Sequence, residues 1–247
     1  MTDAPVPPTG RFDRPGQQEA TPWQNATVVS VRDETPTART FRLSLAAPVA
    51  HLPGQHYVVR LTAEDGYTAS RSYSVASAPD DSGEIELTVE LLPDGEVSPF
   101  LHDVAAPGDV LEVRGPLGRW FTRDTDTPAL LVGGGSGVVP LMAMLRAARR
   151  GAHPEVVRLV VSVRSPAELY YAVEMTGPEV TVVHTREAPP GDPRPPGRLT
   201  AADLGPIGPD VTVYLCGSGG FVEHASALLL ELGVEPAMIR VERFGPS

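Results

Sequence analysis

The spacing of apolar residues changes near residue 122, and this change constrains the possible fold more than any other feature. Before it, short runs rich in β-branched residues recur between turn signals such as Pro53-Gly54 and Asp94-Gly95, a pattern typical of a small antiparallel barrel. After it, apolar runs alternate with segments of helical spacing, which is typical of a doubly wound parallel sheet. The sequence therefore predicts a β + α/β protein, in which an antiparallel β-barrel precedes a doubly wound parallel-sheet domain.

The same pattern places the domain boundaries. Residues 21–123 are assigned to the barrel and residues 127–247 to the α/β domain, whereas the proline-rich residues 1–20 are expected to form a disordered tail. The strands expected in the barrel are residues 26–31, 40–45, 56–61, 70–77, 84–91 and 110–113. The strands expected in the parallel sheet are residues 129–132, 156–163, 180–184, 211–215 and 238–241.

Start and stop signals predict the helices. Ser98 is expected to cap a helix whose first residue is Pro99. The other expected helices are residues 140–150, a helix opened by the capping box Ser165-Pro166-Ala167-Glu168, and residues 221–232.

A glycine-rich turn, Gly133-Gly134-Gly135-Ser136-Gly137, joins an apolar strand to the helix that contains Pro140. In this context glycines let the backbone approach a pyrophosphate, which lies at the helix N-terminus. The alternative is a turn that is merely tight. Residues 216–220 repeat the arrangement after the fourth strand, and the ends of the first and fourth strands flank the expected ligand-binding switch point of such a sheet.

Two segments of the barrel also carry candidate ligand groups. The strand with Arg71-Ser72-Tyr73-Ser74 offers a guanidinium for phosphate, a ring for stacking and a hydroxyl for a ring edge. Gly95-Glu96-Val97-Ser98 leads into a helix N-terminus, which favours anions. The alternatives are a strand with a core tyrosine and a solvated arginine, and an ordinary capped surface helix.

Composition excludes several kinds of chemistry. All 20 basic residues are arginine, so no lysine can form a Schiff base or bind phosphate in a phosphate-binding loop. The net charge of -11 argues against nucleic-acid and anionic-membrane partners. With Cys216 as the single cysteine, we expect no disulfide, no metal site and no iron–sulfur cluster. The sequence shows no apolar run of membrane-spanning length and no signal peptide, so a cytoplasmic location is expected.

Six short motifs follow one another along the chain: Arg71-Ser72-Tyr73-Ser74, Gly95-Glu96-Val97-Ser98, Gly115-Pro116-Leu117-Gly118, residues 133–140, Cys216-Gly217 and Glu242-Arg243-Phe244. In their order and spacing they resemble the ferredoxin–NADP reductase-like flavoproteins. The resemblance runs from about residue 23 to residue 244. It implies a flavin domain followed by a nicotinamide-dinucleotide domain.

The resemblance also implies a role for each candidate residue. The residues that would bind FAD are Arg71, on its phosphates, Ser72, Tyr73, against the ring or ribityl region, Ser74, near flavin N5, and Gly95, Val97 and Ser98, at the pyrophosphate. The residues that would bind NAD(P)H are Gly134, Ser136, Gly137, Arg164, Ser165, Arg186 and Cys216, with Phe244 closing the ring site. The candidate catalytic residues are Ser74, Cys216 and Glu242.

The implied activity is hydride transfer from NAD(P)H to bound FAD, followed by single-electron transfer to a separate acceptor. The acceptor would be a [2Fe–2S] ferredoxin, an oxygenase component or a cytochrome, because this chain lacks the cysteines of an iron–sulfur domain. Arg164 and Arg186 slightly favour NADPH over NADH, and a monomer is expected. The alternatives are a reductase for free flavin or another small acceptor, and a non-catalytic electron-transfer subunit.

Overall fold

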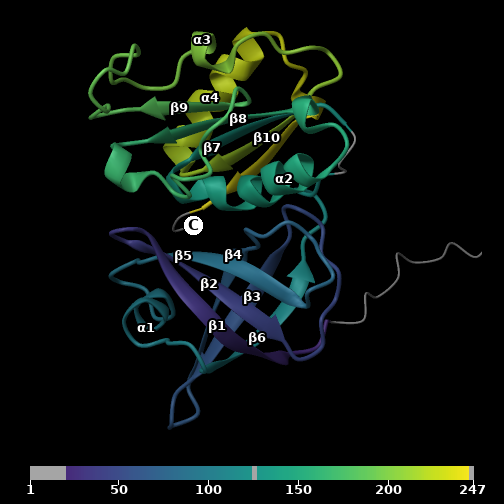
Figure 1. The fold of residues 1–247 in the computed structure, drawn as a ribbon, viewed down its shortest axis with the longest axis vertical. Helices are drawn as coiled ribbons and strands as arrows, with labels where there is room; N and C mark the ends of the chain where they lie inside the picture. The colour runs from purple at the N-terminus through teal and green to yellow at the C-terminus, as the bar shows by residue number, and fades with distance from the viewer. Residues whose placement is uncertain (1–20, 124–126, 245–247) are drawn as a thin grey trace, which may run out of the picture.

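The computed structural model describes residues 21–123 and 127–244. The predicted tail at 1–20 and the terminal Gly245-Pro246-Ser247 lie outside the described residues. The chain forms a barrel and a parallel sheet that are stacked on each other, with helix α2 (Val138–Arg150) between them (Figure 1).

The barrel is an antiparallel sheet of six strands in the order β4-β3-β6-β1-β2-β5. Its strands are β1 (Gln24–Thr35), β2 (Ala38–Leu45), β3 (His56–Thr62), β4 (Thr68–Ser74), β5 (Glu84–Glu90) and β6 (Val110–Leu117). An antiparallel bridge between Val75 and Leu87 joins the end of β4 to β5 and closes the barrel. All six predicted strands are confirmed. Their inward-facing apolar side chains fill one interior that includes Phe41, Val59 and Val113.

Helix α1 (Ser98–Asp103) interrupts the barrel where it was predicted, but its first turn differs from the prediction. The cap residue is Val97, and Ser98 is the first helical residue. The Ser98 hydroxyl does not cap the helix; it accepts a hydrogen bond from the Leu92 N–H at 3.1 Å. It therefore fixes the loop that leads into the helix.

The second sheet is parallel and has five strands in the order β11-β10-β7-β8-β9. Its strands are β7 (Ala129–Gly134), β8 (Val157–Val163), β9 (Val180–His184), β10 (Thr212–Gly217) and β11 (Ile239–Arg243). After β9 the chain crosses back to the other side of β7, so β7 and β10 flank the point where the strand order reverses. The predicted doubly wound sheet and its switch point are confirmed.

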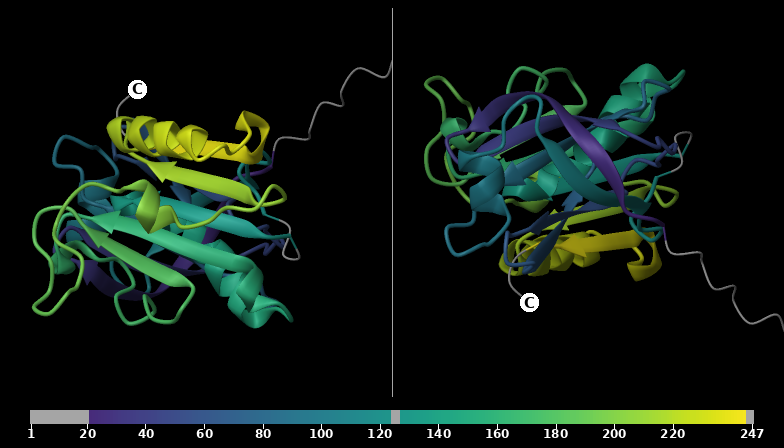
Figure 2. Two further views of the ribbon diagram at one scale, coloured as in Figure 1. Left: turned by 90° about the horizontal axis from the view of Figure 1, so that it is seen from above. Right: turned by 90° about the horizontal axis from the view of Figure 1, so that it is seen from below.

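Helices cover both faces of this sheet. The face toward the barrel is packed by α2, which begins at Val138 rather than at Pro140, and by the segment after β8. The opposite face is packed by α3 (Ala201–Leu204) and α4 (Gly219–Glu231), and α4 lies along the top edge of the molecule in the left view of Figure 2. Short 3₁₀ turns, η1 to η4, occupy Gly135–Gly137, Pro154–Val156, Pro166–Glu168 and Pro236–Met238.

The predicted helix after Ser165 is wrong. Residues 166–168 form only the 3₁₀ turn η3, and the Ser165 side chain makes no capping hydrogen bond. The reason is that Glu168 turns toward Arg164, whose Nε donates to its carboxylate at 2.6 Å, instead of reaching back to the Ser165 N–H. A capping box that was not predicted stands at α3, where Thr200 and Asp203 bond to each other.

In the described ranges 21–123 and 127–244, no helix is both long and apolar enough to cross a bilayer. One apolar cluster is shared by the two domains. It contains Ala38 and Ala76 of the barrel together with α2 and Cys216 of the α/β domain. The two sheets are therefore joined by a common core, and the carboxyl end of β10 reaches it.

Candidate active site

The two glycine-rich turns of the α/β domain touch each other. A Cβ atom added to Gly137 would lie 2.3 Å from the carbonyl oxygen of Cys216, and one added to Gly134 would lie 2.6 Å from the ring of Phe221. Gly135 has a φ of 56°, and a Cβ there would meet no atom within 4 Å. The turn is thus closely packed on one side and open on the other, and an open glycine backbone ahead of a helix fits a pyrophosphate.

Cys216 and Glu242 lie side by side at the carboxyl ends of β10 and β11, where they are partners in the parallel pairing. Cys216 is fully buried, and burial, followed by the nearby Glu242 carboxyl, holds the pKa of its thiol well above the usual range. Burial also raises the pKa of Glu242 to about 7. Its Oε2 atom is buried and has no hydrogen-bond partner in the described structure. The thiol is therefore neutral, and the carboxyl can hold a proton near neutral pH.

Phe244 extends the β10–β11 pairing by one residue. Its backbone N–H donates to the carbonyl oxygen of Gly217 at 3.0 Å, and its half-buried ring packs against the cluster that contains Cys216. The predicted ring-site residues Cys216, Glu242 and Phe244 are therefore brought together.

Strand β4 presents its four candidate residues differently. Arg71 and Ser72 are exposed, Tyr73 is half-buried against the barrel core, and Ser74 is buried opposite His56 of β3. Two residues beyond Ser74, Ala76 belongs to the same core cluster as Cys216. The carboxyl end of β4 thus leads to the apolar core that also contains Cys216 and contacts Phe244.

An ion pair joins β4 to the loop before α1. The Arg71 guanidinium lies 3.7 Å from Glu96, whose carboxylate also accepts a 2.6 Å hydrogen bond from the Tyr67 hydroxyl. Within the loop, a Cβ on Gly95 would lie only 2.9 Å from the Ser98 hydroxyl oxygen, and Val97 is fully buried. The two segments predicted to bind FAD are therefore adjacent, and their exposed arginine fits a phosphate.

The remaining candidates stand at the ends of β8 and β9. The Arg186 N–H donates to the carbonyl oxygen of Arg164 at 2.9 Å, so these two arginines are neighbours. Both arginine side chains are exposed, and Ser165, the residue after Arg164, is half-buried. Glu168, predicted only as a capping residue, pairs with Arg164 and adds a negative charge to this end of the sheet.

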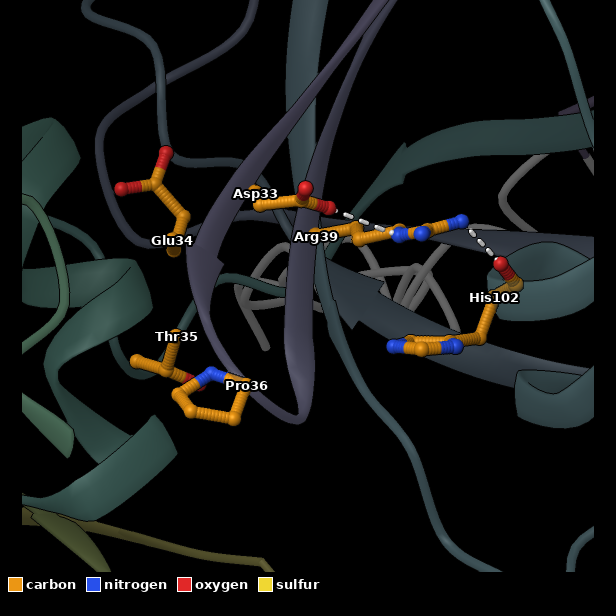
Figure 3. A pocket seen from close by; sticks show the side chains of 6 residues that line it. All are labelled: Asp33, Glu34, Thr35, Pro36, Arg39 and His102. Atoms are coloured by element: carbon orange, nitrogen blue, oxygen red, sulfur yellow. Dashed lines mark hydrogen bonds and ion pairs between the residues drawn. The ribbon is translucent and has the colours of Figure 1, made fainter. Parts of the chain in front are cut away.

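A surface pocket lies away from these residues. It is lined by Asp33, Glu34, Thr35, Pro36, Arg39 and His102, at the β1–β2 hairpin and α1 (Figure 3). The Nε of Arg39 donates to Asp33 at 2.8 Å, and its Nη1 donates to the backbone carbonyl of His102. Arg39 is therefore already paired within the pocket, and Glu34 is bonded to Thr40 outside it. The pocket contains no candidate site residue.

Comparison with known proteins matches each half of the chain to a family. Residues 25–121 match an oxidoreductase FAD-binding domain and residues 131–227 an oxidoreductase NAD-binding domain. The chain is 33% identical over 234 residues to the ferredoxin–NAD(P)⁺ reductase component of the naphthalene 1,2-dioxygenase/salicylate 5-hydroxylase systems of a Ralstonia species, covering 90% of this chain and 69% of that protein. The chain belongs to the ferredoxin–NADP⁺ reductase-like flavoproteins.

Two further likenesses agree with this reductase family. The toluate 1,2-dioxygenase electron transfer component of Pseudomonas putida is 30% identical, covering 90% of this chain and 68% of that protein. The FAD/NAD-binding domain of nitric oxide dioxygenase from Vibrio cholerae superposes with a TM-score of 0.79 at 28% identity, covering 90% of this chain and 99% of that structure. This reductase is therefore an FAD-dependent NAD(P)H oxidoreductase, with the flavin domain first and the nicotinamide domain second.

Proposed function

We propose that the reductase takes a hydride from NAD(P)H at the switch point between β7 and β10 and delivers electrons singly to a separate acceptor protein. The observation that carries this proposal is the contact between Gly137 and Cys216 at the core shared with the barrel. An open glycine-rich turn, a neutral thiol and a protonatable carboxyl thus lie at the junction of the two domains, which supports the proposal.

The proposal assigns each part a task. Arg71, Ser72, Tyr73 and Ser74 hold FAD together with Gly95, Val97 and Ser98. Gly134, Ser136 and Gly137 cradle the dinucleotide, and Arg164, Ser165 and Arg186 face its adenosine half. Cys216 and Phe244 shape the ring site, Ser74 faces the flavin edge, and Glu242 holds a proton at its buried Oε2. FAD, when bound, supplies the conversion of one two-electron hydride into two single electrons.

The nature of the acceptor is inferred from the relatives. One is the ferredoxin–NAD(P)⁺ reductase component of an oxygenase system, and another is a dioxygenase electron transfer component. We therefore propose a [2Fe–2S] ferredoxin or an oxygenase component as the acceptor. The domain boundaries at 21–123 and 127–247, a monomeric state and a cytoplasmic location stay predictions.

We expect the purified protein to be yellow and to keep FAD through gel filtration. Anaerobic NADH or NADPH should then bleach its 450 nm band within the dead time or the first seconds of a stopped-flow experiment, and ferricyanide should restore the band. A flavin that separates from the protein on the column would favour a free-flavin reductase. Bound flavin that neither nucleotide reduces would favour a non-catalytic electron-transfer subunit and contradict the proposal.

The charge around Arg164 supports NADH rather than NADPH. Arg164 is already engaged by Glu168 at 2.6 Å, and the charge of Glu90 also acts on it. A dianionic 2′-phosphate would have to displace or face these carboxylates, whereas a 2′-hydroxyl can donate a hydrogen bond to one of them. The arginines alone slightly favour NADPH, and the pairing of Arg164 with Glu168 reverses that preference in our proposal.

Replacing Glu168 by glutamine should shift the ratio of kcat/KM for NADPH over NADH upward by roughly tenfold, because a charged competitor for the guanidinium is removed. Steady-state ferricyanide assays with both nucleotides measure this ratio. Glu155→Gln, which changes an exposed carboxylate ahead of β8 that pairs with His153, is the matched control and should leave the ratio unchanged. An unchanged ratio in Glu168→Gln would mean that Glu168 does not contribute to the preference between NADH and NADPH.

A further inference from the structure

A polar network crosses the junction of the two domains. On the barrel side it contains side chains of β1, β2 and β5. On the α/β side it contains one arginine of α2 and the segment that follows β8. Its members are Glu34, Thr40, Glu86, Thr88, Arg146, Tyr171 and Glu174.

Tyr171 is the most constrained member of this network. Its side chain is 1% exposed, and its φ of 52° is the only positive value at a non-glycine residue in the described ranges. Its hydroxyl donates to the Thr88 hydroxyl at 2.6 Å, and its backbone N–H donates to Glu34 at 3.1 Å. A positive φ is unfavourable for residues that carry a side chain, so it persists only where surrounding contacts enforce it. Here the contacts come from both sides: the Glu174 and Met175 N–H groups donate to the Tyr171 carbonyl oxygen within the α/β domain, and the barrel binds the Tyr171 hydroxyl and N–H.

Glu34 and Thr88 are themselves held in place within the barrel. The Thr40 hydroxyl donates to Glu34 at 2.7 Å and lies 2.7 Å from the Thr88 hydroxyl. Along β1, Glu34 points away from the Asp33–Arg39 pair (Figure 3). It pairs with Arg32 and also accepts the hydrogen bond from the α/β domain. Tyr171 therefore binds to barrel side chains that are already held in place by one another.

Arg146 of α2 makes a second connection between the two domains. Its Nη1 donates to the carbonyl oxygen of Ala76 at 2.9 Å and to Glu86 at 2.8 Å, both in the barrel. Its Nε and Nη2 donate to Glu174 of the α/β domain at 2.9 Å and 2.5 Å. The guanidinium lies 5.0 Å from the ring of Tyr171. One planar group thus binds both domains and the tyrosine at once.

Both connections lead directly to the candidate active site. Arg146 belongs to α2, which begins immediately after the turn at Gly137, and a helix is stiff over this length. Ala76 lies two residues beyond Ser74 on the barrel side. Tyr170, next to Tyr171, is buried in the cluster that contains Cys216. A displacement of this network would therefore move the dinucleotide turn relative to the flavin strand.

From this geometry we infer that Tyr171 and Arg146 are positioning residues, which lock the α/β domain against the barrel so that the nicotinamide and the flavin meet at the distance that hydride transfer requires. The inference rests on the proposed function. Apolar contacts alone would hold the domains together but tolerate sliding, whereas buried directional hydrogen bonds specify one arrangement. Hydride transfer is sensitive to such sliding, since a misplacement of about 1 Å can cost roughly a hundredfold in rate.

The test compares variants that remove a cross-domain contact with one that removes a similar contact inside one domain. Tyr171→Phe and Thr88→Val each delete one partner of the 2.6 Å hydrogen bond, and Arg146→Gln deletes the guanidinium bridge. The matched control is Arg149→Gln. Arg149 is on the same helix, but its partners Glu174, Thr176 and Glu179 all belong to the α/β domain.

In the FAD-loaded protein, we expect the limiting rate of flavin reduction by NADH to fall at least about tenfold in Tyr171→Phe and Arg146→Gln. The Kd for NADH and the rate of reoxidation by ferricyanide should change less than about twofold, because neither nucleotide affinity nor the second step depends on the lock. Differential scanning calorimetry, which does not depend on activity, should show the single unfolding transition of the parent protein splitting into two. Arg149→Gln should keep the limiting rate and the single transition.

Two outcomes would overturn the inference: limiting rates in Tyr171→Phe, Thr88→Val and Arg146→Gln equal to that of Arg149→Gln, or a single transition with equally lowered stability in all four. Thr88→Val, the mildest change, keeps the test decisive if the arginine variant fails to fold. Failure of the proposed function looks different, because the parent protein itself would then not be reduced by either nucleotide.

Discussion

Replacing Gly137 by alanine should lower the rate of flavin reduction by NADH roughly a hundredfold while leaving FAD bound. A Cβ at this position would lie 2.3 Å from the Cys216 carbonyl oxygen and 2.5 Å from its carbonyl carbon. Both atoms are backbone in the central part of the parallel sheet, so the turn must move rather than the strand. The displaced turn would carry the dinucleotide away from the ring site, and the strain should cost about 1–3 kcal/mol of stability.

Stopped-flow reduction measures this effect, and the flavin content after gel filtration provides the internal reference. Gly208→Ala is the matched control in the same domain, because its added Cβ would meet only a Val211 methyl group at an ordinary 3.7 Å. It should behave like the parent protein. A Gly137→Ala variant with normal reduction would mean that the dinucleotide does not lie on this turn.

Replacing Glu242 by glutamine should stabilise the protein in mildly alkaline solution and have little effect in acid. Burial raises the pKa of Glu242 to about 7 from an ordinary 4.5, so the folded protein binds the proton more tightly than the unfolded chain does. Stability from this group is therefore fully present below about pH 4.5, decreases as the pH rises through about 7, and stays low above that. The difference corresponds to at most roughly 3 kcal/mol.

Thermal unfolding between pH 5 and pH 8.5 checks this. Other carboxyls also titrate on folding, so the informative quantity is the difference in Tm between Glu242→Gln and the parent protein at each pH. It should grow with pH and reach roughly 5–10 °C above pH 7.5. A difference that stays constant across the range would mean that Glu242 titrates normally and that its carboxyl is not the proton-holding group of the site.

Periodicity predicted most of the fold because it depends on near neighbours in the chain. Apolar residues alternate with polar ones along β5, and β9 is mostly apolar. Glycines follow the last residues of α2 and α3. The errors have equally local causes. Ser165 and Glu168 have the spacing of a capping box, but Arg164 is a stronger partner for the carboxylate than a backbone N–H is.

The site was predicted in part. Cys216 and Glu242 were candidates because their motifs resemble those of a reductase family, and the structure pairs them directly at the ends of two neighbouring strands. The contacts of Tyr171 could not be predicted, since they join residues 83 and 137 positions apart. Two successive tyrosines after the turn at Pro166 have no helix or strand periodicity that would indicate which residues they contact. An arginine at position 146, inside an otherwise apolar helix face, was the one available hint that the face binds another domain.

The thiol of Cys216 gives the folded protein a built-in sensor. It is the single cysteine of the chain, and it is 0% exposed at the floor of the junction between barrel and parallel sheet. A maleimide can therefore label the chain at one thiol, and only when that thiol becomes accessible through opening of the junction or through unfolding. The labelling rate equals the rate of opening when labelling is faster than reclosing, and it follows the population of the open form when labelling is slower.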